Sequence, residues 1–236
     1  MKKLALLSLI CVALLLISCP MGGQSSTTTP ESSISYTISD STLNTWVNSI
    51  DTTWVQVIEE ITNTGTVPIY LSSGSYDLEN SEGLIIAHET YISESPQVLA
   101  VGEKGYMYDS TTLDNPVSGS ITVVPNISAK KATIDCIRYP VSEVSLSDTS
   151  YLGIKAVGRI ENTTGVDEDS MIYVEVVLLD SNNHPLGILI DIITDDFLAG
   201  SKIGFEATVL ENMPSSITTS NVASYITYAY PYKFQF

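Results

Sequence analysis

The chain has 236 residues, of which 44% are hydrophobic and 16% are charged, and its 10 basic side chains stand against 27 acidic ones. The hydrophobic fraction excludes a disordered protein, and three cysteines exclude a disulfide-dense scaffold. A net charge of −17 argues against a nucleic-acid-binding protein, because polyanions repel one another.

The first 18 residues have the pattern of a targeting segment. Two lysines follow Met1, and an uncharged apolar run covers residues 4–17. As a helix this run would be about 21 Å long, against about 30 Å of bilayer hydrocarbon. A positive start before a short apolar run is typical of a secretory signal, so we expect residues 1–18 to be a signal peptide.

The signal ends in Leu16-Ile17-Ser18-Cys19, which resembles the lipobox of bacterial lipoproteins: an apolar residue three positions before the acceptor cysteine and a small residue directly before it. The resemblance implies cleavage before Cys19 and a diacylglycerol on its thiol, because a thiolate is the nucleophile. Two acyl chains, palmitate among the candidates, anchor a protein stably where one is marginal. The alternative is an ordinary signal peptide with a chance cysteine.

The mature chain would begin with an anchor and linker, residues 19–33, rich in Gly, Ser, Thr and Pro and therefore flexible. Cys11 lies in the removed segment and Cys19 would carry lipid, which leaves Cys136 without a cysteine partner. We expect Cys136 to be a buried small apolar residue, with a reactive thiol as the other interpretation.

Residues 43–50 leave two possibilities open. Leu43, Trp46, Val47 and Ile50 recur at helical spacing after a plausible cap around Ser39. The Thr and Asn content weakens a helix, so the segment is either one short helix or a further strand.

The rest of the chain repeats itself at a distance of about 100 residues, a common domain size. Residues 54–65 and 153–165 are each an alternating strand that ends in an Asn/Thr/Gly turn. Alternating strands with a turn signal about every ten residues favour an antiparallel sandwich over βαβ units. The sequence predicts two tandem all-β domains, 34–127 and 128–236. The aligned pairs are Val55 with Ile154, Val57 with Ala156, Ile61 with Ile160, residues 68–77 with 171–180, 84–87 with 188–191, and 102–106 with 200–205.

The second unit resembles the FxLYD domain of bacterial and archaeal surface proteins. Val176-Val177-Leu178-Leu179-Asp180 stands in place of the signature, and the first unit keeps Tyr76-Asp77 of it. The resemblance implies an immunoglobulin-like antiparallel β-sandwich and no known activity. The other residues in matching places are Gly158, Asn162, Gly187, Gly200 and Phe205.

No residues with the spacing of a catalytic or metal site stand out. We interpret His88 as a strand-face residue and His184 as a solvated turn residue, neither in a metal-ligand pattern. A dyad of Cys136 and His88 is the least favoured arrangement. We therefore expect no catalytic residue, no metal and no cofactor.

The acidic clusters give no paired-acid site by spacing. Glu59 and Glu60 are neighbours on a strand and should point to opposite faces. Residues 167–169 and 195–196 fall in expected turns, where the acids are either solvated or an opportunistic calcium site. Asp180-Ser181-Asn182 begins like a calcium loop but lacks the later ligands.

The final strand carries an aromatic residue at every second position: Tyr228, Tyr230, Tyr232, Phe234 and Phe236. Pro231 removes one ladder donor and favours an edge position. We expect these rings to cover the sandwich core, with a partner-binding aromatic stripe as the alternative.

Lys104 is the one basic residue between residues 34 and 127. The first unit is therefore strongly anionic, which either serves solubility or favours cationic partners. The function that fits best is a non-enzymatic binding or interaction role at the cell envelope, with the membrane as partner through Cys19 and no nucleic acid. The alternatives are an envelope hydrolase that uses a carboxylate pair and a structural spacer of a surface assembly.

Overall fold

The fold is that of a computed structural model, which describes residues 32–113, 119–150, 153–209 and 213–233. These residues form strands β1 to β14 and one short 3-10 helix, Thr219–Asn221, so the all-β class expected from the sequence is confirmed. The described residues from Ser32 onward belong to one compact unit. Among them, no helix is long and apolar enough to cross a bilayer.

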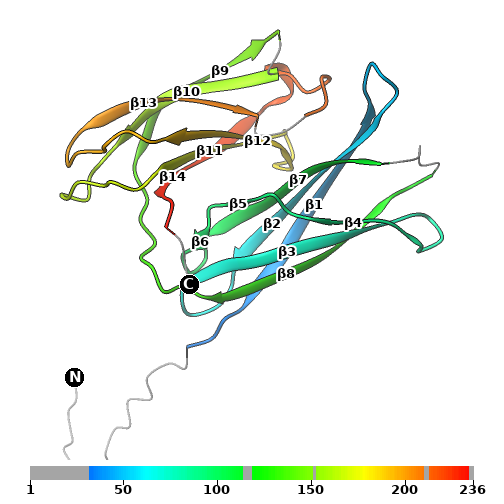
Figure 1. Cartoon of the computed structure of the whole chain (residues 1–236), viewed down its shortest axis with the longest axis horizontal. Helices are drawn as coiled ribbons and strands as arrows, with labels where there is room; N and C mark the ends of the chain where they lie inside the picture. Colours follow the sequence, from blue (N-terminus) through cyan, green and yellow to red (C-terminus); the bar gives the residue numbers. More distant parts are fainter. Residues whose placement is uncertain (1–31, 114–118, 151–152, 210–212, 234–236) are drawn as a thin grey trace, which may run out of the picture. The chain divides into compact units, whose positions relative to one another are not determined.

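Strands β1 to β8 form two antiparallel sheets that pack face to face (Figure 1). Sheet A has the order β1-β2-β7-β5. In sheet B, β3 pairs with β8 along one edge and with β4 and β6 along the other. The strand bounds are β1 Tyr36–Val47, β2 Thr53–Asn63, β3 Ile69–Glu79, β4 Ile85–Thr90, β5 Ser93–Ser95, β6 Val98–Leu99, β7 Lys104–Leu113 and β8 Thr122–Lys131.

Alternation along β2 sets the core between sheets A and B. Val55, Val57 and Ile61 are fully buried and pack against sheet B, because successive side chains on a strand point to opposite faces. The partners from β3 are buried as well, among them Leu71 and Leu78.

The remaining strands form sheet C, in the order β14-β11-β12-β13-β10-β9. Residues of β10 and β13 share one apolar cluster with residues of β11 and β14, so this sheet bends back on itself around its own core. The expected face of Ile172, Val174, Val176 and Leu178 lies in that core. The bounds are β9 Val141–Thr149, β10 Gly153–Glu161, β11 Ile172–Leu179, β12 Pro185–Ile193, β13 Lys202–Val209 and β14 Ser224–Pro231.

Strand β11 is buried on both faces. Its second face presents Val177 and Leu179 to sheet A, where Ile58, Tyr106 and Tyr108 meet them. A strand covered on both sides has a nearly continuous apolar sequence, which explains the uninterrupted run that ends at Leu179.

The two halves repeat the same strand order. Strands β1-β2-β7 correspond to β9-β10-β13, and β4-β3-β8 correspond to β12-β11-β14. The turns after β2 and β10 are built alike around a buried Asn. The side-chain amide of Asn63 donates to the carbonyls of Val67 and Leu99, and that of Asn162 donates to those of Val166 and Phe197.

The turns after β3 and β11 are also equivalent, and they correct the expected alignment. Asn80 Oδ1 accepts the backbone N–H groups of residues 82 and 84, and Asp180 Oδ1 accepts those of residues 182 and 184. Asp180 therefore corresponds to Asn80, not to Asp77. The left-handed position of this turn holds Gly83 in one half, φ 76°, and Asn183 in the other, φ 65°, since both residues tolerate that conformation.

Residues 43–47 are strand, not helix. Leu43 lies opposite Val57 and Trp46 opposite Trp54 in the β1–β2 ladder. The two indoles stack with their ring centroids 6.1 Å apart. Cross-strand pairing of aromatic rings thus outweighs the helical spacing of the apolar residues.

Candidate functional site

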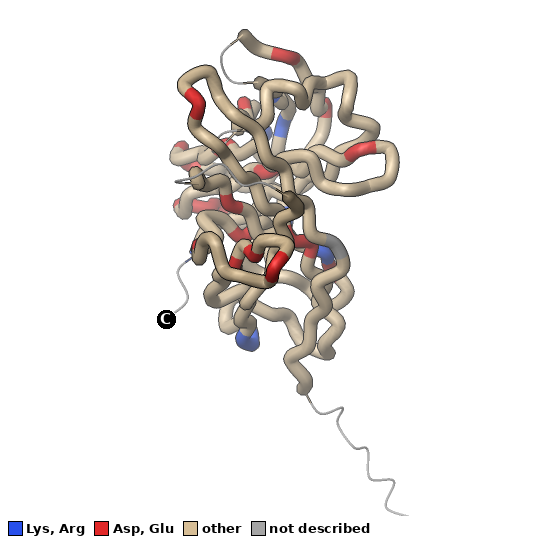
Figure 2. The backbone as a smooth tube through the Cα atoms, turned by 90° about the vertical axis from the view of Figure 1, so that its right-hand side faces the viewer, with Lys and Arg blue, Asp and Glu red and all other residues tan. Residues whose placement is uncertain are grey.

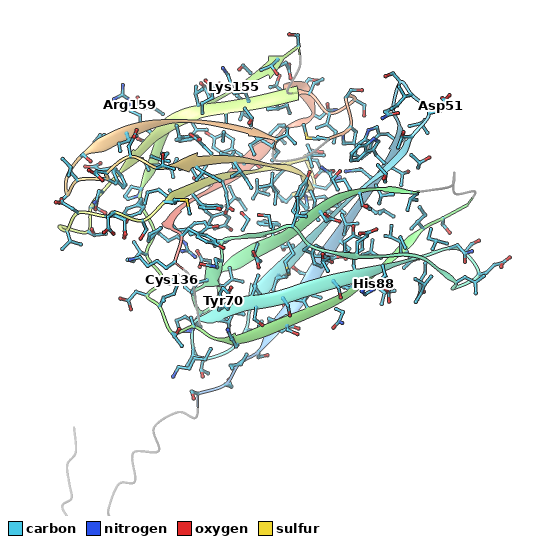
Figure 3. The ribbon with its side chains drawn as sticks, in the orientation of Figure 1. Asp51, Tyr70, His88, Cys136, Lys155 and Arg159 are labelled. Atoms are coloured by element: carbon cyan, nitrogen blue, oxygen red, sulfur yellow. The ribbon has the colours of Figure 1, made fainter. Side chains whose placement is uncertain are left out.

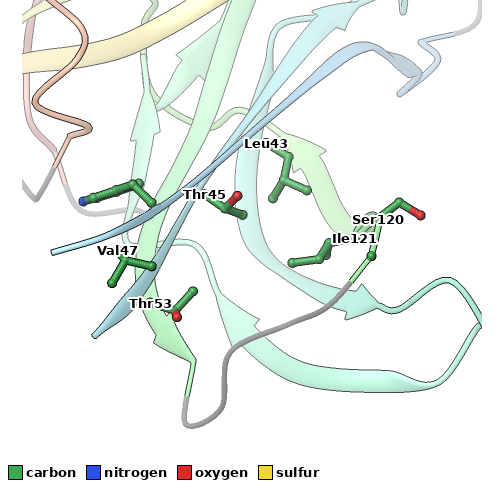
Figure 4. Close-up of a pocket in the computed structure, with 8 residues that line it drawn as sticks. Leu43, Thr45, Val47, Thr53, Ser120 and Ile121 are labelled. Carbon is green, nitrogen blue, oxygen red and sulfur yellow. The ribbon is translucent and has the colours of Figure 1, made fainter. Parts of the chain in front are cut away.

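A pocket lined by both apolar and hydroxyl-bearing side chains opens at one end of the A/B sandwich (Figure 4). It lies between the end of β1, the start of β2 and the residues that precede β8, and its volume is about 420 Å³. That volume is in the range of roughly 300–1,000 Å³ typical of small-ligand sites. The lining residues are Leu43, Thr45, Trp46, Val47, Thr53, Gly119, Ser120 and Ile121.

The pocket exists because the edge strands β1 and β8 are closed against each other only at one end. There the hydroxyl of Tyr36 donates to the carbonyl of Ile127 and ties β1 to β8. Toward the other end, Leu43 and Ile121 pack on the core residues of both sheets and form the floor of the opening.

Large aliphatic side chains surround this end of the sandwich. Val47 is 60% exposed, Ile50 in the β1–β2 turn is 78% exposed, and Ile85 at the start of β4 is 60% exposed. Exposed apolar residues grouped beside a pocket mark an interaction site more often than scattered ones do.

The electrostatic surroundings of the pocket are anionic. Asp51 and Glu82 lie in the two hairpin turns of this end and are exposed, and no carboxylate is among the lining residues that the structure describes. Lys104 pairs with Glu60 at the opposite end of β7 and β2, with 2.7 Å between Nζ and Oε1. Acidic positions outnumber basic ones along the tube in Figure 2.

A cluster of polar side chains is buried between sheets A and C. The carboxylate of Glu175 on β11 accepts the hydroxyls of Ser95 at 2.6 Å and Tyr230 at 3.0 Å. Burial raises the pKa of Glu175 to about 8, and burial also raises the pKa of the neighbouring Glu94. Because Glu175 is 0% exposed, this carboxyl is out of reach of a substrate.

Arg138 closes the edge of this cluster. Its Nε and one terminal nitrogen bind Glu103 at 2.9 and 2.8 Å, and its guanidinium carbon lies 5.6 Å from the ring centroid of Tyr230. Cys136 is half-buried beside the same carboxylate, with Sγ 3.7 Å from Glu103 Oε2. Burial raises the pKa of this thiol, which makes it a weak nucleophile at neutral pH.

The C-terminal aromatic strand lies against sheet A. Tyr228 and Tyr230 are 7% and 3% exposed and belong to the cluster between sheets A and C. Tyr232 is half-buried and stacks on Tyr173, with ring centroids 4.7 Å apart. Phe234 and Phe236 lie outside the described residues. A partner-binding role of this strand stays a prediction.

The histidines and cysteine do not form a dyad. His88 is exposed on β4 with Nδ1 2.6 Å from Asp77 Oδ1, and Figure 3 places it well apart from Cys136. His184 lies in the turn after β11, 3.6 Å from Asp180 Oδ2. Within the described residues, no group of three or more His, Cys, Asp or Glu side chains could hold a metal ion.

The fold separates Glu59 from Glu60, but it brings residues 167–169 beside residues 195–197, because Glu168 and Phe197 exchange two backbone hydrogen bonds. The carboxylates of Glu59 and Glu60 point away from each other. Glu59 accepts a hydrogen bond from the hydroxyl of Ser41, and Glu60 accepts one from the ammonium group of Lys104. Glu168 is buried and pairs with Lys233 at 3.1 Å. Cys19 lies outside the described residues.

Sequence reasoning missed both the pocket and Glu175. A lone acid in the apolar run of β11 is a signal for a buried carboxyl. The pocket has no signal in the sequence, because Leu43 and Ile121 have the apolar character of core residues. No family model and no curated protein matches this chain.

Proposed function

We propose that this chain is a lipid-anchored extracytoplasmic protein with a non-enzymatic binding role at the cell envelope. The open pocket at one end of the A/B sandwich is the observation that carries the binding role. It is presented by paired strands, and rigid scaffolds commonly display binding residues at their loop ends.

The anchoring part of the proposal rests on Cys19 and on where the described chain begins. Ser33 and Ser35 bond to Thr66 and Thr64, at the end of β1 opposite the pocket. From there to Val47, β1 extends for roughly 35 Å at the rise of a strand. A lipid on Cys19 would thus leave the pocket facing away from the point where the chain enters the sandwich.

The proposed architecture is a tandem pair of immunoglobulin-like sandwiches, of which the second is similar to FxLYD domains. The shared strand order of the two halves and their matching buried Asn63 and Asn162 support it. The expected boundary after residue 127 falls within β8, because residues 128–131 still pair with β3 of the first sandwich, so the two sandwiches divide after Lys131. Folds of this kind present their binding residues on loops or sheet edges, and the pocket lies between two edge strands.

Fractionation of cells that express the wild type, Cys19→Ala and Cys11→Ala tests the anchored placement. We expect the wild type and Cys11→Ala in the membrane fraction, because Cys11 is removed with the signal. Cys19→Ala should appear in the soluble extracytoplasmic fraction. Membrane association of Cys19→Ala equal to that of the wild type would refute the lipid anchor.

A further inference from the structure

The outer face of sheet A, which is turned away from sheet B, carries two rows of side chains beside its contact with sheet C. Ile58 and Tyr108 on this face pack against sheet C. Because side chains alternate along a strand, Gln56 and Trp54 of β2 point to the same side as Ile58. Residues that pair across a ladder share a face. The polar row is Asn44, Gln56 and Ser110, and the aromatic row is Trp46, Trp54 and Thr112.

The aromatic row forms a platform of two indoles. The rings of Trp46 and Trp54 are nearly parallel, with 14° between their planes and 6.1 Å between their centroids. Both residues are half-buried, and Thr112 beside them is exposed. A sugar ring with equatorial hydroxyls has C–H groups on both of its faces, and these apolar faces pack on an indole because burial of apolar surface is favourable. The platform is therefore suited to the flat rings of a saccharide.

The polar row fixes an amide group next to the platform. Nδ2 of Asn44 donates to Oε1 of Gln56 at 2.8 Å, and Asn44 is half-buried. This bond fixes the plane of the Asn44 amide, which carries both donors and an acceptor. Asn44 lies two residues before Trp46 on the same face of β1. A hydroxyl group also donates and accepts, so the Asn44 amide is suited to the hydroxyls of a ring that packs on Trp46.

Gln56 has the role of a positioning residue for Asn44. It is 0% exposed, and its Nε2 has no hydrogen-bond partner among the described residues. A buried donor without a partner lowers the stability of a fold, and an aliphatic side chain of similar size would avoid that loss. The amide is explained if its oxygen orients Asn44 for a ligand. Because Gln56 is buried, Asn44 and not Gln56 would meet that ligand.

We propose that the aromatic row and Asn44 bind an uncharged β-1,4-linked oligosaccharide, whose ring faces pack on the two indoles and whose hydroxyls bond to the Asn44 amide. Neither row carries a charged side chain, although the whole chain has a net charge of −17, and this favours an uncharged ligand over a basic one. In β-1,4-linked glucose or N-acetylglucosamine all ring substituents are equatorial, so the ring faces stay apolar. The inference rests on the proposed binding role and gives it a ligand class. The platform adjoins the pocket, because Trp46 also lines it.

Tryptophan fluorescence tests the site directly, because Trp46 and Trp54 are the two tryptophans of the chain. The protein is purified as the Cys19→Ala variant and titrated with cellotetraose and with chitotetraose. We expect a saturable change in emission with at least one of them within about 10 mM. Acrylamide should quench the free protein and should quench it less once the sugar is bound. No saturable change with either sugar, or emission that acrylamide does not quench, would overturn the inference.

Two variants test the platform and the polar row separately by isothermal titration calorimetry. Trp46→Ala should bind at least about tenfold more weakly, because one apolar ring is lost. Gln56→Leu should bind at least about threefold more weakly, because Asn44 is no longer oriented. Its midpoint of urea denaturation should stay equal or rise, because a buried unpartnered amide is removed. This second variant keeps the test decisive if Trp46→Ala disturbs the fold.

Tyr70→Ala is the matched control, because Tyr70 is a half-buried aromatic residue on β3 of the other sheet. Figure 3 places Tyr70 far from Asp51, which lies in the β1–β2 turn next to the platform. This variant should bind the sugar as the Cys19→Ala protein does. Unchanged binding by folded Trp46→Ala or by Gln56→Leu would overturn the inference. A loss of stability in Gln56→Leu would also overturn it, because the amide would then be structural.

Decaproline is the competing probe, since proline-rich segments also dock on aromatic side chains. Saturable binding of decaproline without binding of either oligosaccharide would overturn the inference and assign the platform to a proline-rich segment instead.

These outcomes are separate from those of the anchor experiment. Fluorescence and calorimetry use purified Cys19→Ala protein and do not depend on lipid. Loss of the anchor with retained sugar binding would remove the envelope placement alone, whereas a retained anchor without sugar binding would remove the saccharide site alone.

Discussion

Glu175 should make the stability of the protein fall as pH rises from about 5 to about 8. Burial raises its pKa to about 8 in the folded protein, above the ordinary value of 4.5. Within this window the folded state holds one proton more than the unfolded state, so the free energy of unfolding decreases by about 1.4 kcal/mol per pH unit. At pH 7 the decrease relative to pH 4.5 amounts to about 3 kcal/mol.

The substitution Glu175→Gln isolates this effect. The amide has the shape of the protonated acid: its oxygen can accept a hydrogen bond from one of the hydroxyls of Ser95 and Tyr230, and its NH2 group can donate to the oxygen of the other. Titrating groups that do not interact with Glu175 contribute equally to both proteins, so the difference in free energy of unfolding between variant and wild type removes their contribution. That difference should shift in favour of the variant by about 3 kcal/mol or more between pH 5 and pH 8.

Urea denaturation at several pH values, followed by far-UV circular dichroism and by the fluorescence of Trp46 and Trp54, measures the difference. Glu206→Gln is the control, because Glu206 is exposed on β13, where its carboxylate pairs with Lys155 at 3.2 Å. Its effect on the free energy of unfolding is the reference with which the effect of Glu175→Gln is compared at each pH. A pH-independent difference for Glu175→Gln would show that this carboxyl does not take up a proton on folding, and the reasoning would fail.

Three further predictions concern the repeat and Cys136. Asn162→Ala should lower the free energy of unfolding by about 3 kcal/mol, because two carbonyls lose their hydrogen-bond donor, and Asn63→Ala should have the same effect. Urea denaturation measures both effects, with exposed Asn182→Ala as the control. A loss no larger than that of the control would contradict the role of the buried amide. A fragment of residues 132–236 should fold alone with a β-type circular-dichroism spectrum, since the core of sheet C lies within it; a fragment that stays unfolded while the full chain folds cooperatively would refute the division after Lys131. In a Cys19→Ala background, Cys136 should react with iodoacetamide at least about tenfold more slowly at pH 7.5 in the folded than in the urea-unfolded protein, because burial raises its pKa; equal rates, followed by mass spectrometry, would show an accessible thiol.

The local patterns of the sequence predicted the strands well. The alternation of Val55, Val57 and Ile61, and of their counterparts Ile154 and Ile160, placed the correct side chains in the two cores. This worked because one buried face per strand leaves a period of two in the sequence.

The features that the sequence did not predict depend on contacts between residues that are far apart in the chain. The helical spacing of the apolar residues around Trp46 left a helix as possible as a strand, because a local pattern does not include Trp54, the cross-strand partner of Trp46. The environment of Glu175 includes Ser95 of β5, which is far away in sequence. No local sequence pattern therefore predicts the pKa of Glu175. The alignment of Asp77 with Asp180 failed because short Asp-containing turns resemble one another, and only the hydrogen bonds identify Asn80 as the equivalent residue.

The pocket could not be predicted from the sequence. Leu43 and Ile121 have the apolar character of core residues, and nothing in their spacing indicates that they border an opening.

The central claim is an envelope protein held by lipid at one end and open for binding at the other. Intact-mass and N-terminal peptide mass spectrometry of the protein extracted from membranes tests the lipid anchor most directly. The account predicts a mature chain that begins at Cys19 with a diacylglycerol on the thiol. An unmodified Cys19, or a mature chain that begins at another residue, would contradict it.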